Sequence, residues 1–500
     1  MFGFTRRNLL AGVAGALGGR PLGSAGGPSP AGSYLRRDSS DGRLNLIMIV
    51  VDTWSTAWMG CYGNPLVRTP SVDRLASRSA VFVDAYPEAL PTIPARRVMY
   101  TGRRAFPGDL WRTWNAPTVR GWHPLYEEDY TLAEKLIDLD WGTLLASDLY
   151  HGFQPGFSLH RGFEAWHDVR GQEADGHETG PNRGIDLTAW LHPSQVDYQS
   201  GYSARQFTRY LANRSYWKTE DDWPVSQVFT QAGQWLENRV TDDRPFYLHI
   251  ESYSPHEYWD PPDNYYRLYM RSNYTGPRLI QPPDDASVLS PAALEHVRAL
   301  YAGMVTFTDT RLGRFLQKVE DLGLMENTII VFVADHGTQT GEQGEIHKKE
   351  WALRRPVTNV PFLIYFPLED LGGRRVNGFV QHTDIYPTLM DLMGAPSPPR
   401  VTGQSLKDAL WSGEAPKRDF IVTGWGDHAS IRTAEYNYIG RWNPGDSWEQ
   451  LYDLRKDPAE NTNILLSNLS LVEDCRAKLR QYVEQSWEIT RGNLARKLTE

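Results

Sequence analysis

The chain has 500 residues, of which 40% are hydrophobic and 23% are charged, and its formal net charge is −9 at pH 7. This length is too great for one small core and suits a large α/β domain with a smaller companion. The negative charge argues against nucleic acid or an anionic membrane as the main partner. The two cysteines, Cys61 and Cys475, can form one disulfide at most, and two unpaired thiols are the simpler interpretation.

Residues 1–25 are predicted to be an export signal. Arg6 and Arg7 precede an apolar stretch, residues 9–17, that is too short to cross a bilayer. This pattern predicts a twin-arginine signal peptide, read by the twin-arginine export machinery, and hence a periplasmic or extracellular protein. A chance Arg-Arg pair ahead of a disordered tail is the alternative. Residues 26–43, rich in Gly, Pro and Ser, are predicted to be a linker. No later segment has 18 successive apolar residues, so we expect no stable membrane span.

Four mainly apolar runs predict strands, and the first of them is continuous and rich in β-branched residues, as expected for a strand that is buried on both faces of a parallel sheet. These runs are residues 46–51, 246–250, 329–334 and 362–366. Helical patterns are found at residues 131–139, 225–240 and 291–322. Strands that alternate with helices predict a doubly wound α/β domain, with a large mixed or parallel sheet, over residues 44–395.

The sequence changes character at a Pro-rich break, residues 396–399. Short aromatic segments follow at 436–439 and 451–454, and a last helix is predicted near residues 471–487. We therefore expect residues 396–500 to form a smaller C-terminal α+β subdomain.

Acidic residues and histidines follow three of the predicted strands. Asp52 ends the first run, Asp335 and His336 end another, and His256 comes six residues after a third. Ligands of doubly wound sheets bind at the carboxyl ends of the strands, so these side chains should share one cleft. Carboxylate oxygens suit Ca²⁺, Mg²⁺ or Mn²⁺. One Asp at a strand end is often only a helix cap or a loop anchor, but two at different strand ends favour a metal site.

Thr92 comes directly before a predicted helix that has Pro94 in its first turn and runs to Gly102. The free N–H groups and partial positive charge of a helix N-terminus suit an anionic oxygen. Arg96 would lie on the same side of the helix and could hold that oxygen or a substrate oxyanion. Taken alone, Thr92 is most simply a helix N-cap.

The frame Thr92-x-Pro94-x-Arg96, followed by Thr101-Gly102-Arg103, resembles the active-site signature of the sulfatases, a family of the alkaline phosphatase superfamily. Further blocks resemble that family in order, at residues 45–52, 60–64, 68–75, 255–257, 334–337, 341–344, 384–389 and 451–454. The resemblance implies the sulfatase fold, one divalent metal ion, which could be Ca, Mn or Mg, and a small-molecule, glycan or aryl ester substrate. It also implies active-site roles for His256 and Lys348.

Several positions depart from the family's pattern. The family's nucleophile is formylglycine, made from Cys or Ser, which Thr92 cannot become. The second metal-binding Asp of the family is Thr53 here, and the His of its Gly-Glu-His-Gly block is Gln343. The usual Lys-x-His segment is replaced by one that contains Asp148 and His151. His151 could keep the histidine's role, or it could be an ordinary loop residue.

These observations predict a metal-dependent hydrolase of sulfate or phosphate-type esters that uses unmodified Thr92 as its nucleophile. One divalent cation would be held by Asp52, Asp335 and His336, and Thr92 would complete its shell. A formylglycine diol can expel sulfate by reforming its aldehyde, whereas water must attack the central atom of a threonyl ester. This difference makes phosphodiesters and phosphonate monoesters reasonable substrates beside sulfate esters.

The remaining site residues are expected to bind the transferred group and to move protons. Arg96, Lys348 and His256 would bind its non-bridging oxygens, and His256 or His151 would protonate the leaving oxygen. Two alternatives stay open. One is a phosphodiester or phosphonate hydrolase, or a transferase of phospho-headgroups, with the same fold. The other is a catalytically silent sulfatase homologue that only binds anions.

Overall fold

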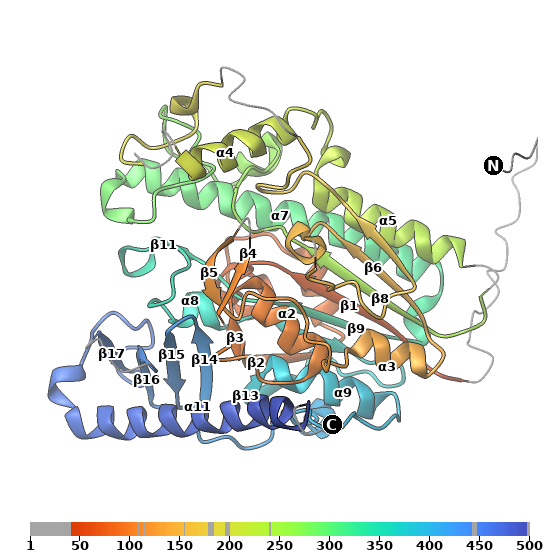
Figure 1. The fold of residues 1–500 in the computed structure, drawn as a ribbon. Helices are drawn as coiled ribbons and strands as arrows, with labels where there is room; N and C mark the ends of the chain where they lie inside the picture. Colours follow the sequence, from red (N-terminus) through yellow and green to blue (C-terminus); the bar gives the residue numbers. More distant parts are fainter. Residues whose placement is uncertain are drawn as a thin grey trace, which may run out of the picture. The chain divides into compact units, whose positions relative to one another are not determined.

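The computed structural model describes residues 42–108, 110–113, 116–154, 156–178, 185–195, 201–239, 242–442 and 448–497. The predicted signal peptide, residues 1–25, and nearly all of the predicted linker, residues 26–43, lie outside these ranges. The described residues belong to one unit, residues 37–500. Its large sheet and covering helices confirm the predicted α/β class (Figure 1).

The large sheet has eight strands in the order β13-β2-β12-β9-β1-β8-β6-β7. Their bounds are β1 Asn45–Val51, β2 Ala80–Tyr86, β6 Gly142–Ser147, β7 Ala165–Asp168, β8 Phe246–Ser252, β9 Thr328–Ala334, β12 Phe362–Tyr365 and β13 Arg375–Gln381. All four predicted strands are present, as β1, β8, β9 and β12. The sheet is mixed, because β12 pairs antiparallel with both β9 and β2 while the other pairs are parallel.

The burial of the central strand β1 explains why residues 46–51 are all apolar. This strand pairs with β8 on one side and β9 on the other, and each of its seven residues is at most 4% exposed. A strand that is covered on both faces has no solvent-facing positions, so its residues do not alternate between apolar and polar.

Helices lie on both faces of the large sheet (Figure 1). The described α-helices before the last one are α1 Pro70–Ala76, α2 Thr92–Thr101, α3 Leu132–Asp138, α4 Gly201–Arg214, α5 Pro224–Asn238, α6 Asp263–Tyr266, α7 Pro291–Asp321, α8 Arg355–Thr358, α9 Ile385–Leu392 and α10 Lys407–Ser412. On one side α5 packs against α7 and β8, and on the other α2 packs against α3 and α9. The predicted helix at 291–322 is the unbroken α7, and its start is fixed by the Ser290 hydroxyl, which accepts a hydrogen bond from the N–H of Ala293.

A second sheet has five strands in the order β17-β16-β15-β14-β3. Its bounds are β3 Ala89–Leu90, β14 Ile421–Trp425, β15 His428–Arg432, β16 Tyr436–Arg441 and β17 Glu449–Asp453, and the long helix α11, Leu469–Lys497, packs against it. Its edge strand β3 comes from the N-terminal part of the chain and immediately precedes the segment that carries Thr92. The predicted domain boundary near residue 396 stays a prediction.

Both cysteines are free thiols, Cys61 half-buried and Cys475 buried. Among the described helices none is both long and apolar enough to cross a membrane.

Candidate active site

Three predicted metal ligands meet where two neighbouring strands end. Asp52 follows β1, and Asp335 and His336 follow β9, which runs parallel to β1 with Val51 opposite Ala334. The carboxylate oxygens of Asp52 and Asp335 and a ring nitrogen of His336 lie within 4.8 Å of one another, and all three side chains are buried. The strand-end argument therefore placed these residues together correctly.

The bonding of His336 leaves one ring nitrogen free for a ligand. Its Nδ1 lies 3.0 Å from the carbonyl oxygen of Gly337, which fixes the proton there. Its Nε2 is buried and has no hydrogen-bond partner among the described residues. Burial lowers the pKa of His336 to about 3, so the imidazole is neutral at physiological pH. A neutral imidazole with a free lone pair beside two carboxylates fits a divalent cation.

Thr53 stands where the family has a second Asp. It contributes no charge, but its hydroxyl donates to Oδ1 of Asp52 at 2.6 Å and its N–H donates to Oδ1 of Asp335 at 3.0 Å. Its φ of 63° is unusual for a β-branched residue and is held by these contacts. Thr53 thus orients two of the candidate ligands.

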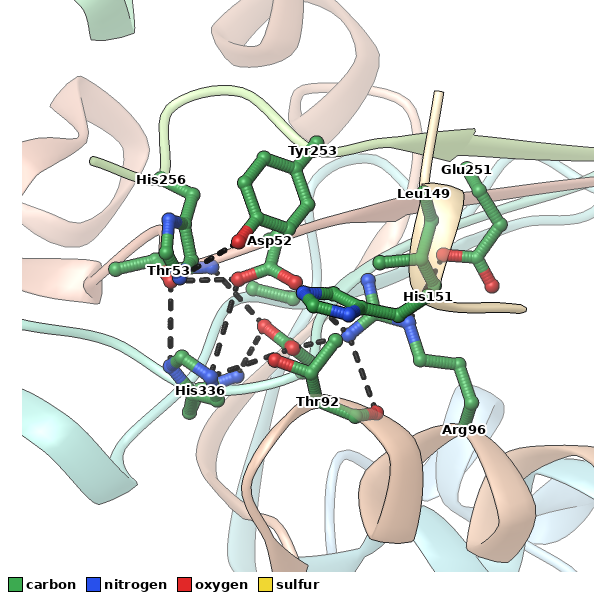
Figure 2. A network of polar contacts seen from close by, with 12 residues as sticks. Asp52, Thr53, Thr92, Arg96, Leu149, His151, Glu251, Tyr253, His256 and His336 are labelled. Atoms are coloured by element: carbon green, nitrogen blue, oxygen red, sulfur yellow. Dashed lines mark hydrogen bonds and ion pairs between the residues drawn. The ribbon is translucent and has the colours of Figure 1, made fainter. Parts of the chain in front are cut away.

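Thr92 is the first residue of α2 and lies beside the candidate metal ligands Asp52 and His336 (Figure 2). The Arg96 guanidinium extends from the next turn into the carboxylates, with Nη1 3.1 Å from Oδ2 of Asp52 and also hydrogen-bonded to Asp335. Nη1 further donates to the backbone carbonyl of Thr92 at 3.4 Å, and Nη2 has no partner among the described residues. Arg96 is fully buried, and it is not among the residues that line the cavity beside Thr92.

Glu251, which the sequence interpretation missed, is the third carboxylate around Arg96. Its Oε2 accepts from Nε of Arg96 at 3.0 Å, and its Oε1 lies 2.9 Å from Nε2 of His249 and 3.2 Å from the Tyr100 hydroxyl. Burial tends to raise the pKa of Glu251, but Arg96 and His249 hold it below its usual value. A Glu at the end of a buried strand could have indicated this role. The predicted strand ended at residue 250, however, whereas β8 continues for two more residues and includes Glu251.

A cavity of about 810 Å³ opens above this buried group. Four predicted site residues line it, namely Thr92, His151, His256 and Lys348. The large sheet and the segments after its strands thus bring the expected nucleophile, histidines and lysine to one pocket.

Lys348 and His256 form one hydrogen-bonded group in the wall of this cavity. Nζ of Lys348 lies 2.8 Å from Nε2 of His256 and 2.8 Å from Oε1 of Glu257. The Tyr253 hydroxyl lies 3.2 Å from the same imidazole nitrogen. Burial alone would lower the pKa of Lys348, but Glu257 and Asp52 raise it, so the ammonium stays charged.

His151 is held by a second residue that the sequence interpretation missed. Its Nε2 lies 3.2 Å from Oε2 of Glu173, which also accepts from the Tyr150 hydroxyl at 2.8 Å. Nδ1 of His151 is buried and has no hydrogen-bond partner in the described structure. Burial would raise the pKa of Glu173, but its bonds to His151 lower it to about 2. Glu173 has a φ of 43°, a costly conformation for a residue with a side chain.

Two other departures from the family's pattern, Asp148 and Gln343, are not among the residues that line this cavity. Asp148 is fully buried, and its Oδ1 accepts from the backbone N–H of Tyr253 at 2.6 Å. Burial raises the pKa of Asp148 to about 8, so the carboxyl is largely protonated at pH 7. Gln343 hydrogen-bonds through Nε2 to the backbone carbonyl of Ala459 at 2.7 Å.

Comparison with known proteins shows the family of this chain. The profile of the family Sulfatase matches residues 44–125 and 188–395, and that of N-sulphoglucosamine sulphohydrolase, C-terminal, matches residues 341–488. An arylsulfatase of Clostridium perfringens is 26% identical over 461 residues, covering 85% of this chain and 90% of its own. The iduronate 2-sulfatase of Homo sapiens is 26% identical over 432 residues, covering 74% of this chain and 72% of its own.

Solved structures share the fold. The phosphonate monoester hydrolase of Agrobacterium radiobacter superposes with a TM-score of 0.65 at 21% identity, over 90% of this chain and 96% of its own. A protein solved with its substrate D-glucosamine-2-N,6-O-disulfate has a TM-score of 0.66 at 19% identity, over 90% of this chain and 99% of its own. The chain thus shares the fold of these solved structures. The profile match shows that it belongs to the sulfatase family, whose members are sulfuric ester hydrolases.

Proposed function

We propose that this sulfatase-family protein is a metal-dependent hydrolase of sulfate or phosphate-type esters and that unmodified Thr92 is its nucleophile. The observation that carries the proposal is the position of Thr92, at a helix N-terminus, in the cavity wall and beside the Asp52–Asp335–His336 group. The residues that surround the family's nucleophile are thus present around Thr92, whose hydroxyl needs no modification to act as a nucleophile.

Asp52, Asp335 and His336 would hold one divalent cation, since each offers a buried ligand atom and Nε2 of His336 has no hydrogen-bond partner among the described residues. When bound, a divalent cation would favour the ionised form of a neighbouring hydroxyl and stabilise charge on the transferred group. Carboxylate ligands suit Ca²⁺, Mg²⁺ or Mn²⁺. The three carboxylates around Arg96 exceed its single positive charge, which favours a further cation here.

The side chains around the cavity suit the two halves of an ester hydrolysis. In the first half the Thr92 oxygen bonds to sulfur or phosphorus as the alcohol oxygen leaves, and in the second half water breaks the threonyl ester. Lys348 lines the cavity, and its charged ammonium would bind non-bridging oxygens. His151 suits the proton transfer to the leaving oxygen better than His256 does, because its Nδ1 is free while Nε2 of His256 already contacts Lys348 and Tyr253.

A phosphonate monoester or phosphodiester is the second candidate substrate. Phosphonate monoester hydrolases, including one from Silicibacter pomeroyi with a TM-score of 0.63, share the fold. Sulfate monoesters, phosphodiesters and phosphonate monoesters each carry one negative charge on the transferred group, which matches a site with a single cation.

The N-terminal segment bears on where this chemistry takes place. We propose export by the twin-arginine route, which carries folded proteins and would allow a metal to be bound before export. The Arg6-Arg7 pair ahead of a short apolar stretch supports this proposal.

The test of the proposed function is turnover by the purified protein with Mn²⁺, Ca²⁺ or Mg²⁺ and after chelation. The substrates are 4-nitrophenyl sulfate, a nitrophenyl phosphodiester and a nitrophenyl phosphonate. Thr92→Val removes the hydroxyl at nearly constant volume and should lower kcat by at least about 1,000-fold. Thr101→Val, at the other end of α2, is the matched control and should keep most of the activity. Mass spectrometry of quenched enzyme should place the sulfo or phospho group on the peptide that contains Thr92.

Two results would contradict the proposal. Full turnover by Thr92→Val would exclude Thr92 as the nucleophile. Tight sulfate binding without turnover of any ester would instead support the silent anion-binding alternative.

A further inference from the structure

The cavity is much larger than the group that would be transferred. Its volume of about 810 Å³ lies within the range of pockets for drug-sized ligands, whereas a sulfate or phosphate group has only a few heavy atoms. Beyond Thr92 and His151 the wall continues to Arg205 and Arg209 of α4. This second region would face the alcohol part of an ester whose transferred group lies at Thr92.

Acidic side chains near the reactive end of the cavity are already bonded to neighbours. Glu173 accepts hydrogen bonds from His151 and the Tyr150 hydroxyl, and Glu257 accepts one from Lys348. These carboxylates therefore hold the catalytic side chains in place and are not available to neutralise α4.

The acids of the adjoining wall have partners too. Oδ1 and Oδ2 of Asp175 accept from the Arg170 guanidinium at 2.6 and 2.7 Å, and Asp168 lies 3.9 Å from the same group. Glu350 lies 3.4 Å from the His428 imidazole. Arg170 is thus a structural cation of the wall.

Arg205 and Arg209 differ from these paired groups. They lie four residues apart on α4, so they share one face of the helix, and both line the cavity. Nη1 of Arg209 donates to the backbone carbonyl of Ala174 at 3.2 Å, which leaves its charge uncompensated. Over the described ranges of the chain, no carboxylate forms an ion pair with either arginine. Guanidinium groups bind sulfate, carboxylate and phosphate with two parallel hydrogen bonds.

We propose that Arg205 and Arg209 form a subsite for a second anionic group on the alcohol part of the substrate. The physiological substrate is then an ester of an acidic alcohol, such as a saccharide with a further sulfate or carboxylate, and not a neutral aryl ester. This inference rests on the proposed function only in taking the Thr92 end of the cavity as the place of the transferred group.

The test is a binding measurement, so it does not depend on turnover. We would titrate D-glucosamine-6-O-sulfate and D-glucosamine-2-N,6-O-disulfate by calorimetry into the full chain with Thr92→Val, which prevents turnover during the titration. The disulfate should bind at least about tenfold more tightly, which corresponds to one or two charge-assisted hydrogen bonds. Adding Arg205→Gln and Arg209→Gln should abolish this preference and leave the affinity for the monosulfate within about twofold.

Arg480→Gln, at an exposed position of α11, makes the same change of charge per residue and should preserve the preference. Equal affinity for the two sugars, absence of binding by both, or a preference that survives in the double arginine variant would overturn the subsite. Failure of the proposed function would be seen separately, as intact turnover of nitrophenyl esters by Thr92→Val.

Discussion

Replacing Asp148 by Asn should make the protein more stable, and the gain should grow as the pH rises. Asp148 is fully buried at the end of β6, and its Oδ2 has no hydrogen-bond partner among the described residues. Burial, with smaller contributions from the charges of Glu251 and Asp52, raises its pKa from 3.8 to about 8. Asn keeps the carbonyl oxygen that accepts from the N–H of Tyr253 and has no charge to ionise.

The magnitude follows from proton linkage. The folded protein keeps a proton on Asp148 up to about pH 8, whereas the unfolded chain loses it near pH 4. Folding therefore binds a proton in this window, and the free energy of unfolding contributed by Asp148 falls by about 1.4 kcal/mol per pH unit as the pH rises. Between pH 5.5 and 8.5 the difference between Asp148→Asn and the wild type should grow by about 3 kcal/mol.

Urea denaturation at pH 5.5, 7.0 and 8.5, with EDTA present, measures this difference. Chelation is needed because a bound cation would itself favour the ionised carboxyl. Asp140→Asn is the control, since that side chain is 70% exposed, and it should change stability by less than about 0.5 kcal/mol at each pH. The reasoning would be refuted if the stability difference between Asp148→Asn and the wild type stayed constant over the three pH values or shrank as the pH rose. Asp148 would then not be a buried protonated carboxyl.

Three further predictions concern the groups around the cavity. Glu251→Gln removes one of three carboxylates from buried Arg96 and should lower the free energy of unfolding by about 1–3 kcal/mol in urea denaturation, so unchanged stability would contradict the network. Glu173→Gln should lower kcat by about 10–100-fold with little change in KM, because His151 loses its carboxylate partner, and a change in KM alone would argue for a binding role. Because burial lowers the pKa of His336 to about 3, its ring stays neutral in mild acid, and Mn²⁺ affinity measured by calorimetry should fall less than about threefold from pH 7.0 to 5.5. An unperturbed His ligand would lose about tenfold over that range, and such a loss would show that His336 titrates normally.

The sequence by itself determined the class of fold and the strand-end part of the site. The strands β1 and β9 are visible as apolar runs because a strand covered on both faces has no solvent-facing positions, and β8 is visible as a shorter run that is interrupted by His249. Asp52 and Asp335 end two of these runs, and parallel strands bring their carboxyl ends to one edge. The start of α2 at Thr92 could also be predicted from the sequence, because a helix start depends on a few neighbouring residues.

Only the tertiary structure decided which side chains surround those residues. Arg96 of α2 and Glu251 of β8 are 155 positions apart, and only the folded chain brings them within hydrogen-bond distance. Glu173 reaches His151 through an irregular segment with a positive φ, for which no periodic pattern exists. The antiparallel direction of β12 and the pairing of β3 with β14 depend on strand partners that are distant in the sequence. Local patterns specify which segments form strands and helices, whereas long-range packing selects their partners and so shapes the cavity above Thr92.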